Sequence, residues 1–179
     1  MKTIGTFIVL AAICAALTVF ASSGKIPAEA KAVAPFDQSK YLGNWYEIAR
    51  LDYKWEKNLD NVTACYALNE NGTIRVENRG YNFKKDKWEK SIGKAKPAED
   101  PNVGELKVSF FGPFYAGYNV IAIDKDYKYA LVAGESTDYL WILSREKTIP
   151  AAIREKYLKL AQEVGYNTEA LVWVKHDKD

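Results

Sequence analysis

Few side chains in this sequence could perform catalysis, and their spacing does not bring them together. The single histidine, His176, is the fourth residue from the C-terminus, where we expect a frayed tail. No His-based triad and no metal-ligand set can be assembled around it. Asp124 and Asp126 fall in a predicted tight turn, which is a poor place for acid–base chemistry. We therefore expect no metal and no cofactor.

Cys65 is the remaining candidate nucleophile. The other cysteine, Cys14, lies in an apolar N-terminal run, so no disulfide is expected within a processed chain. A lone cysteine is more often a small, inert apolar residue than a reactive one. We therefore expect a binding function, with catalysis by Cys65 as the alternative.

The segment KVSFFGPFYAGYNV, from Lys107 to Val120, has a different chemical character. Gly-Pro segments normally form exposed, polar turns, so aromatic side chains there indicate a binding surface. What this surface faces depends on the elements around it. Its aromatic residues are Phe110, Phe111, Phe114, Tyr115 and Tyr118.

Short runs rich in Val, Ile, Tyr and Trp, separated by turn residues, predict an all-β body. Eight sequential strands favour an antiparallel up-and-down barrel, whose interior holds one small ligand. The expected strands are Trp45–Leu51, Val62–Leu68, Thr73–Gly80, Trp88–Ala95, Leu106–Phe111, Tyr118–Asp124, Tyr129–Ala133 and Leu140–Arg145.

A helical pattern follows the strands. Apolar residues recur at helical spacing between Ile153 and Val164. Thr148 is the candidate N-cap, Pro150 falls in the first turn and Gly165 ends the helix. This helix should pack outside the barrel, and a ninth strand is expected over Ala170–Val174.

The expected loops differ strongly between the two ends of such a barrel. Alternate connections of a meander share a rim, so the first, third, fifth and seventh loops meet. That rim also carries Lys54, Lys57, Lys84, Lys85 and Lys87, which would favour an anionic headgroup. At the other rim, Tyr127 is the only aromatic residue expected. The aromatic rim, which we interpret as the mouth of a binding cavity, contains Tyr53, Trp55, Tyr81, Phe83, Trp88, Phe110, Phe111, Phe114, Tyr115, Tyr118 and Tyr139.

The N-terminus reads as a secretory signal peptide. One lysine precedes an apolar run, and Ala21-Ser22-Ser23 is a plausible cleavage site before Gly24. An uncleaved membrane anchor is the alternative. Lipoprotein processing at Cys14 is disfavoured, because Ile13 precedes it and apolar residues continue to Phe20. We assign 1–23 to the signal peptide, 24–35 to a flexible leader and 36–179 to the folded domain.

At Gly43–Tyr46 the sequence reads GNWY, which resembles the Gly-x-Trp signature that opens the first strand of lipocalins. The resemblance continues through VTACYALNENGTIRVENRGY, LKVSFFGPFYAGYNVIAID, YALVAG and DYLWILSR, and it covers Phe36 to about Val174. A lone Gly-x-Trp is weak, but this ordered set is specific. The similarity is greatest to bacterial lipocalins, whose relatives include plant temperature-induced lipocalins and apolipoprotein D.

The resemblance implies an eight-stranded calyx whose closed end has a structural signature. Trp45, close after Gly43, should plug that end, and Arg145 should pack over its indole through a cation–π contact.

Strand alternation suggests which residues line the calyx. If Trp141 shares a face with Arg145, it points inward above Leu143. In the second strand Val62, Ala64, Tyr66 and Leu68 share the inward face, and Cys65 faces outward. In the fifth strand Lys107 and Ser109 face outward, and in the sixth Val120 faces inward. The expected ligand-binding residues are Tyr66, Leu106, Val108, Phe110, Phe114, Tyr115, Tyr118 and Trp141.

The resemblance implies binding and sequestration of a fatty acid or lysophospholipid, in membrane lipid storage, repair or stress response. Some lipocalins isomerise prostanoids through a calyx cysteine, but the outward Cys65 argues against that here. A protein or membrane contact through the aromatic rim, or a homodimer, is the other alternative. The formal net charge of +2 gives no reason to expect nucleic acid as a partner. We expect a secreted or periplasmic protein rather than an outer-membrane lipoprotein.

Overall fold

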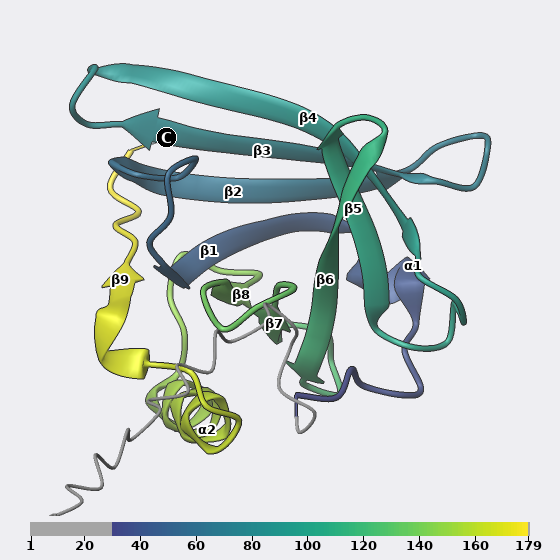
Figure 1. Ribbon diagram of the computed structural model, residues 1–179. Coiled ribbons are helices and arrows are strands. Elements are labelled where there is room, and N and C mark those ends of the chain that lie inside the picture. Colours follow the sequence, from purple (N-terminus) through teal and green to yellow (C-terminus); the bar gives the residue numbers. More distant parts are fainter. Residues whose placement is uncertain (1–29, 179) are drawn as a thin grey trace, which may run out of the picture.

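The computed structural model describes residues 30–178 and shows an antiparallel β-barrel. The strands pair in the order β2-β3-β4-β5-β6-β7-β8-β1-β9, and an additional β1–β2 pairing closes the barrel (Figure 1). The prediction of an eight-stranded barrel with a ninth strand is confirmed. The strands are β1 Gly43–Leu51, β2 Leu59–Leu68, β3 Ile74–Asn82, β4 Lys87–Pro97, β5 Glu105–Phe111, β6 Phe114–Ile123, β7 Tyr129–Ala133, β8 Leu140–Ser144 and β9 Leu171–Trp173.

The aromatic Gly-Pro segment is a tight hairpin rather than a loop. β6 begins at Phe114, four residues before the expected Tyr118, and Phe111 pairs directly with Phe114. Only Gly112 and Pro113 separate the two strands. Tyr118 therefore lies well inside β6, away from the turn.

Strand β1 changes partner along its length. Its first half pairs with β2, from Gly43 to Tyr46, and its last three residues pair with β9. A register shift between Glu47 and Ala49 in the β1–β8 pairing lies between these two regions. The β1–β2 pairing thus ends before the mouth, and β9 continues the sheet along β1.

The C-terminal tail also bridges β1 and β2. Val174 N donates to Ile48 O at 3.0 Å, and Asn61 N donates to Lys175 O at 2.7 Å. His176 Nε2 donates to Glu47 O at 2.8 Å, and its ring meets Tyr46 edge-on. The expectation of a frayed tail is therefore wrong, because the tail supplies backbone partners that the separated strands lack. Figure 1 shows this yellow segment running from β9 to β2.

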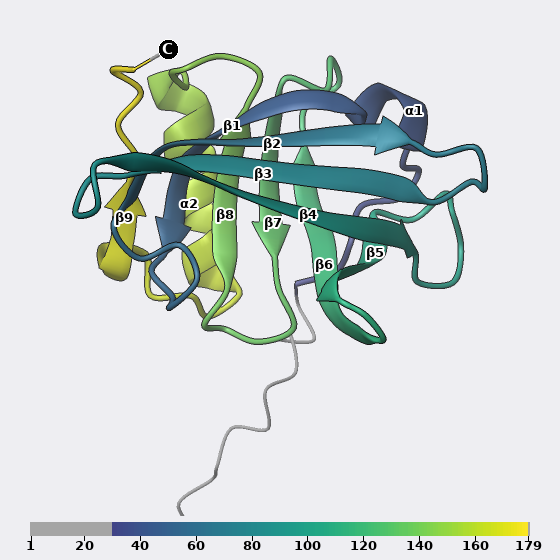
Figure 2. The ribbon, with the colours of Figure 1, turned by 90° about the horizontal axis from the view of Figure 1, so that it is seen from above.

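Helix α2, Ala151–Glu163, packs outside the barrel beside β8 and β9 (Figure 2). Its buried Tyr157 and Ala161 join a core cluster that includes Ile142 of β8 and Leu171. Thr148 is not the N-cap. Pro150 occupies that position with extended backbone. Because a proline disfavours helical geometry in the residue before it, the helix does not begin at Ile149 or earlier. Gly165, with φ +96°, follows the helix end as predicted.

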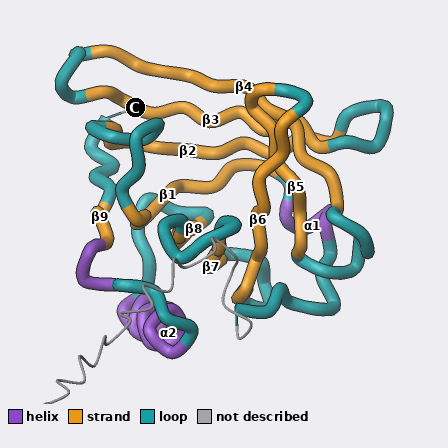
Figure 3. Tube along the Cα trace, in the orientation of Figure 1, coloured by secondary structure: helices purple, strands orange, loops and turns teal. Residues whose placement is uncertain are grey.

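Two short helices were not predicted. α1, Gln38–Tyr41, begins after Asp37, whose carboxylate accepts from Ser39 N and Lys40 N. α1 lies at the opposite end of the barrel from the β3–β4 loop (Figure 3). The 3₁₀ helix η1, Thr168–Ala170, precedes β9.

The end of the expected leader lies against the barrel. Val33 N donates to Val120 O at 2.8 Å, and Gly104 N donates to Val33 O at 2.9 Å. Ala30 is buried. The expected signal peptide, including Cys14, lies outside the described residues.

Candidate ligand-binding site

Trp45 fills the closed end of the barrel. It is fully buried, and its Nε1–H donates to Tyr41 O at 2.8 Å. The Arg145 guanidinium lies 3.7 Å from the indole centroid and donates to main-chain carbonyls, including Asn44 O at 2.7 Å. Gly43 adopts φ +93°, and a Cβ there would lie 3.4 Å from Arg145 Nη1. These contacts join β1, β8 and the α1 segment into one plug.

Three tyrosine hydroxyls lie above this plug. Tyr118 OH is 2.6 Å from Tyr41 OH and 2.9 Å from Tyr66 OH. Burial raises the pKa of Tyr41 and Tyr118 well above its usual value. These hydroxyls are therefore neutral, and Tyr66 and Tyr118 also line the cavity above them. The floor of the cavity is therefore mainly aromatic, with few polar groups.

A cavity of about 550 Å³ opens from this floor. This volume falls in the range of small-molecule sites. Of the eight residues expected to bind ligand, only Leu106 is not part of its wall. Leu106 is fully buried in the core cluster that also contains Trp45, and it pairs with the floor residue Tyr118. The seven that do line it are Tyr66, Val108, Phe110, Phe114, Tyr115, Tyr118 and Trp141.

Strand alternation correctly predicts most of the other side-chain orientations in the barrel. Val62, Ala64 and Leu143 line the cavity, and Cys65 is not among its described lining residues. One expectation is wrong, because Leu68 ends β2 beyond the closed end and is exposed. Ser109, which was expected to face outward, is not among the described residues that line the cavity, and it is buried.

Exposed aromatic side chains surround the mouth. Trp55 is 63%, Phe111 68% and Phe114 78% exposed, and the rings of Trp55 and Phe111 lie 5.8 Å apart. Phe83, in the β3–β4 loop, is also exposed.

Three other aromatic residues lie elsewhere than expected. Tyr81 and Trp88 pack together beside the cavity rather than in its wall, under Lys178 and Arg79 respectively. Tyr118 belongs to the floor. The register of β3 and β4 explains the pair, because Tyr81 and Trp88 are direct cross-strand partners.

The predicted lysines are near the mouth but do not form its wall. Lys54 lies over the Trp55 ring at 4.6 Å, and Lys85 pairs with Glu89 at 2.9 Å. The lining cations among the described residues are Arg79 and Lys90.

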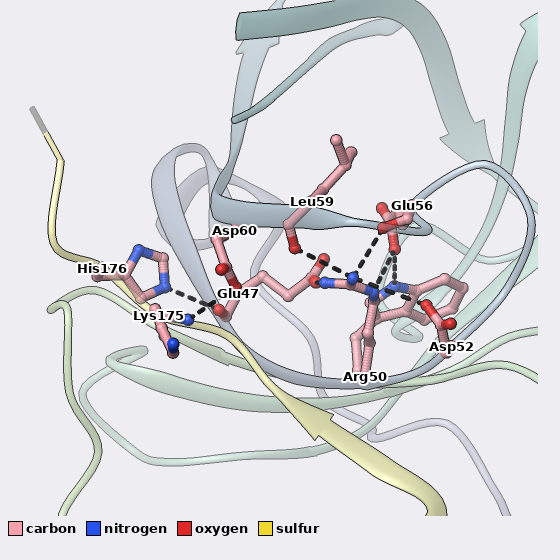
Figure 4. A network of polar contacts seen from close by, with 9 residues as sticks. Glu47, Arg50, Asp52, Glu56, Leu59, Asp60, Lys175 and His176 are labelled. Carbon is pink, nitrogen blue, oxygen red and sulfur yellow. Dashed lines mark hydrogen bonds and ion pairs between the residues drawn. The ribbon is translucent and has the colours of Figure 1, made fainter. Parts of the chain in front are cut away.

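A buried charged network interrupts the apolar wall below the β1–β2 loop (Figure 4). Arg50 Nη1 donates to Glu47 Oε1 at 2.8 Å. Its Nη2 donates to the main-chain oxygens of Glu56 and Leu59 at 2.7 and 3.1 Å. Glu56 Oε2 accepts from Trp141 Nε1 at 3.1 Å. Arg50 therefore ties β1, the loop and the start of β2 together.

The two carboxyls of this network lie in the cavity wall and are poorly solvated. Glu47 is 4% and Glu56 7% exposed. Burial raises the pKa of both, and the nearby Glu56 charge raises that of Glu47 further, while Arg50 opposes these shifts. Glu47 and Glu56 therefore keep their protons to higher pH than ordinary carboxyls do.

Three aromatic rings pack beside this network. The Tyr53 ring meets Tyr139 and Trp141 edge-on at 5.4 and 5.9 Å, and Tyr139 stacks on Trp141 at 6.2 Å. All three line the cavity.

Neither Glu47 nor Glu56 was predicted as a site residue. Glu47 could have been found, because it stands two residues after Trp45 and shares its inward parity. Glu56 lies in a loop without periodicity, and no sequence signal marks it.

Within residues 30–178, no group of three His, Cys, Asp or Glu side chains could hold a metal ion. No helix of that range is long and apolar enough to cross a membrane.

Comparisons with known proteins agree with this architecture. A lipocalin-like domain model matches residues 36–176. The "Outer membrane lipoprotein Blc" of Citrobacter freundii is 49% identical over 168 residues, which cover 93% of this chain and 95% of the relative. "Temperature-induced lipocalin-1" of Arabidopsis thaliana is 36% identical over 152 residues, covering 80% and 81% of the two chains.

A solved structure shows the same fold at lower identity. Insecticyanin from the tobacco hornworm Manduca sexta superposes with a TM-score of 0.67 at 22% identity, over 81% of this chain and 83% of that one. The domain match and the relatives show that this chain belongs to the lipocalin family, whose members bind small hydrophobic ligands.

Proposed function

We propose that this protein sequesters or transports a single-chain lipid, a fatty acid or a lysophospholipid, in the cell envelope. The observation that carries the proposal is the cavity of about 550 Å³, closed at one end by Trp45 and open at an aromatic mouth. Each CH₂ buried there contributes roughly 0.8 kcal/mol, part of which offsets the ordering of the chain. An acyl chain of ~16 carbons therefore has ample binding energy.

The placement of Cys65 supports a carrier rather than an enzyme. Ala64 and Tyr66, its neighbours in β2, line the cavity, so the thiol points to the other face. A ligand in the cavity would not meet this nucleophile.

The mouth suits collection of lipid from a membrane surface. Trp55, Phe111 and Phe114 are exposed there, and Lys54 lies among them. Aromatic and cationic side chains together favour an anionic bilayer surface, and the lysines also suit the phosphate of a lipid headgroup. Phe114→Ser should lower co-sedimentation with vesicles containing phosphatidylglycerol, whereas Leu68→Ser, an equally apolar exposed site at the closed end, should not.

The location proposed is the periplasm or the exterior after cleavage before Gly24. The relatives named outer membrane lipoproteins support an envelope location. The mass of the purified protein would show the cleavage site and any attached lipid.

Native mass spectrometry of the protein purified without detergent tests the function. We expect a bound species with the mass of a fatty acid or lysophospholipid that solvent extraction releases. Trp141→Ala should weaken rebinding, because Trp141 lines the cavity, and Trp173→Ala, on the exterior strand β9, should not. A protein that purifies empty and also fails to bind added single-chain lipids would refute the carrier proposal.

A further inference from the structure

The cavity wall beside the β1–β2 loop carries more negative than positive charge. Glu47 and Glu56 both line the cavity, and Arg50 is the cation that contacts them. Asp52, which is not among the described lining residues and whose side chain is 38% exposed, lies 3.7 Å from Arg50 Nη2. Within the wall, two carboxyls face one guanidinium, so a negative charge remains when both are ionised.

Arg50 is already committed to other partners. Nη1 bonds Glu47, and Nη2 bonds two main-chain oxygens. Its Nε is buried without a hydrogen-bond partner and lies 3.9 Å from Glu56 Oε2, too far for a bond. Glu56 is thus ion-paired with Arg50 but accepts no hydrogen bond from it.

The hydrogen-bond donors that Glu56 does have are neutral. Trp141 Nε1 donates to its carboxylate at 3.1 Å, and the Tyr53 hydroxyl also favours its ionised form. Neither donor cancels a charge. A nine-tenths buried carboxylate in the wall of an open cavity, hydrogen-bonded by neutral donors and sharing Arg50 with Glu47 and Asp52, is suited to a cationic group from the ligand.

We propose that this cavity selects lipids whose polar end carries a positive charge, either a protonated amine or a quaternary ammonium, and that Glu56 meets that charge. The inference rests on the carrier function proposed above. The aromatic wall formed by Tyr53, Tyr139 and Trp141 adds cation–π attraction on the same side of the cavity. The remaining lining charges balance in sign, with Arg79 and Lys90 against Glu89 and Glu135.

This selectivity predicts the order of affinity among the candidate ligands. A fatty acid would place its carboxylate near Glu47 and Glu56. A lysophospholipid with an ethanolamine or choline group brings a cation for Glu56 and a phosphate for the lysines of the mouth. We therefore expect lysophosphatidylcholine to bind more tightly than lysophosphatidic acid of the same acyl chain.

The test uses two probes with twelve-carbon chains, dodecyltrimethylammonium and dodecanoate. Calorimetric titration below the micelle concentrations at pH 7.5 should give an affinity at least about tenfold higher for the ammonium probe. The formal net charge of +2 favours anions at long range, so this preference would report the cavity itself. Equal or tighter binding of dodecanoate would overturn the inference.

Glu56→Gln should bring the two affinities to within about threefold, because the amide keeps an acceptor for Trp141 but loses the charge. Glu163→Gln, on the exposed face of α2, changes the total charge equally and should leave the ratio unchanged. If Glu56→Gln does not fold, the ratio for the unaltered protein decides alone. Binding of uncharged monolauroylglycerol and dodecanoate without the ammonium probe would refute only the charge selectivity. Failure of all three probes to bind would refute the carrier function as well.

Discussion

Trp45 shows how one side chain can decide the stability of this barrel. It is fully buried, hydrogen-bonded to α1 and covered by Arg145. Trp45→Ala should lower the free energy of unfolding by about 3–5 kcal/mol, through lost burial and an unfilled cavity. Trp173→Ala is the matched control, because Trp173 is 43% exposed and should cost less than about 1 kcal/mol. Denaturant unfolding of both variants measures the difference, and similar losses would contradict the role given to Trp45.

The buried carboxyls predict an unusual pH dependence of stability. Burial raises the pKa of Glu56 above its ordinary value of 4.5, so between that value and the raised pKa the folded protein binds more protons than the unfolded chain. The contribution of Glu56 to stability therefore falls as the pH rises from about 4.5, by at most about 1.4 kcal/mol per pH unit.

The difference between the unaltered protein and Glu56→Gln reports this effect together with the part of the Glu47 shift that the Glu56 charge causes, which has the same sign. His176, whose pKa is lowered by burial, destabilises the fold as the pH falls below its ordinary value of 6.5, but it does so equally in both proteins. Urea unfolding from pH 4 to 8 should show Glu56→Gln gaining relative stability as the pH rises. Parallel curves would contradict the raised pKa of Glu56.

At the residue scale, the sequence predicts a side chain well where strand parity holds. Trp141 and Val108 line the cavity as alternation implies. Leu106 obeys the same parity but is buried in the core cluster and does not line the cavity, because alternation fixes a face and not what packs against it. Glu56 is set by the fold of a loop around Arg50, which no local pattern encodes.

At the element scale, the C-terminal tail substitutes for the pairing that β1 and β2 lack near the mouth. A chain ending at Val174 would lose the partner of Asn61 N and the bond from His176 to Glu47 O. We expect a loss of about 1–3 kcal/mol in the free energy of unfolding and faster hydrogen exchange in β2 around Asn61.

Lys178→Ala serves as the control for this truncation. It removes the side chain over Tyr81 but keeps the hydrogen bond from the main-chain Lys178 N to the side-chain Asn61 Oδ1. It should change stability by less than about 0.5 kcal/mol. Unchanged exchange in the truncated chain would mean that β1 and β2 remain closed without the tail.

The elements themselves were mostly predictable, because the eight strands of the barrel show alternation or β-branched runs and β9 is a short apolar run. The exceptions have local causes. β6 starts early because the Gly-Pro turn is only two residues long. α1 has four residues, too few for a periodic signal, and it forms around the Asp37 cap and the buried Tyr41.

At the scale of the whole molecule, the barrel combines two packed regions with one unfilled space. One core joins α2 to the outside of β7 and β8, and the other surrounds Trp45 at the closed end. The second core continues into the wall of the cavity of about 550 Å³, which opens at the mouth. The part of the barrel around the cavity therefore lacks the side-chain packing that stabilises the rest.

This division predicts that a ligand stabilises the entire fold. A lysophospholipid present at 100 times its Kd should add about 2.7 kcal/mol to the free energy of unfolding. For a chain of this size, that corresponds to a rise in Tm of roughly 5–10 °C. Ala64→Phe, which places a ring inside the cavity from β2, should remove the rise while keeping the fold. An equal rise in Tm for the Ala64→Phe protein would mean that the lipid binds outside the barrel, since a blocked cavity cannot hold the lipid.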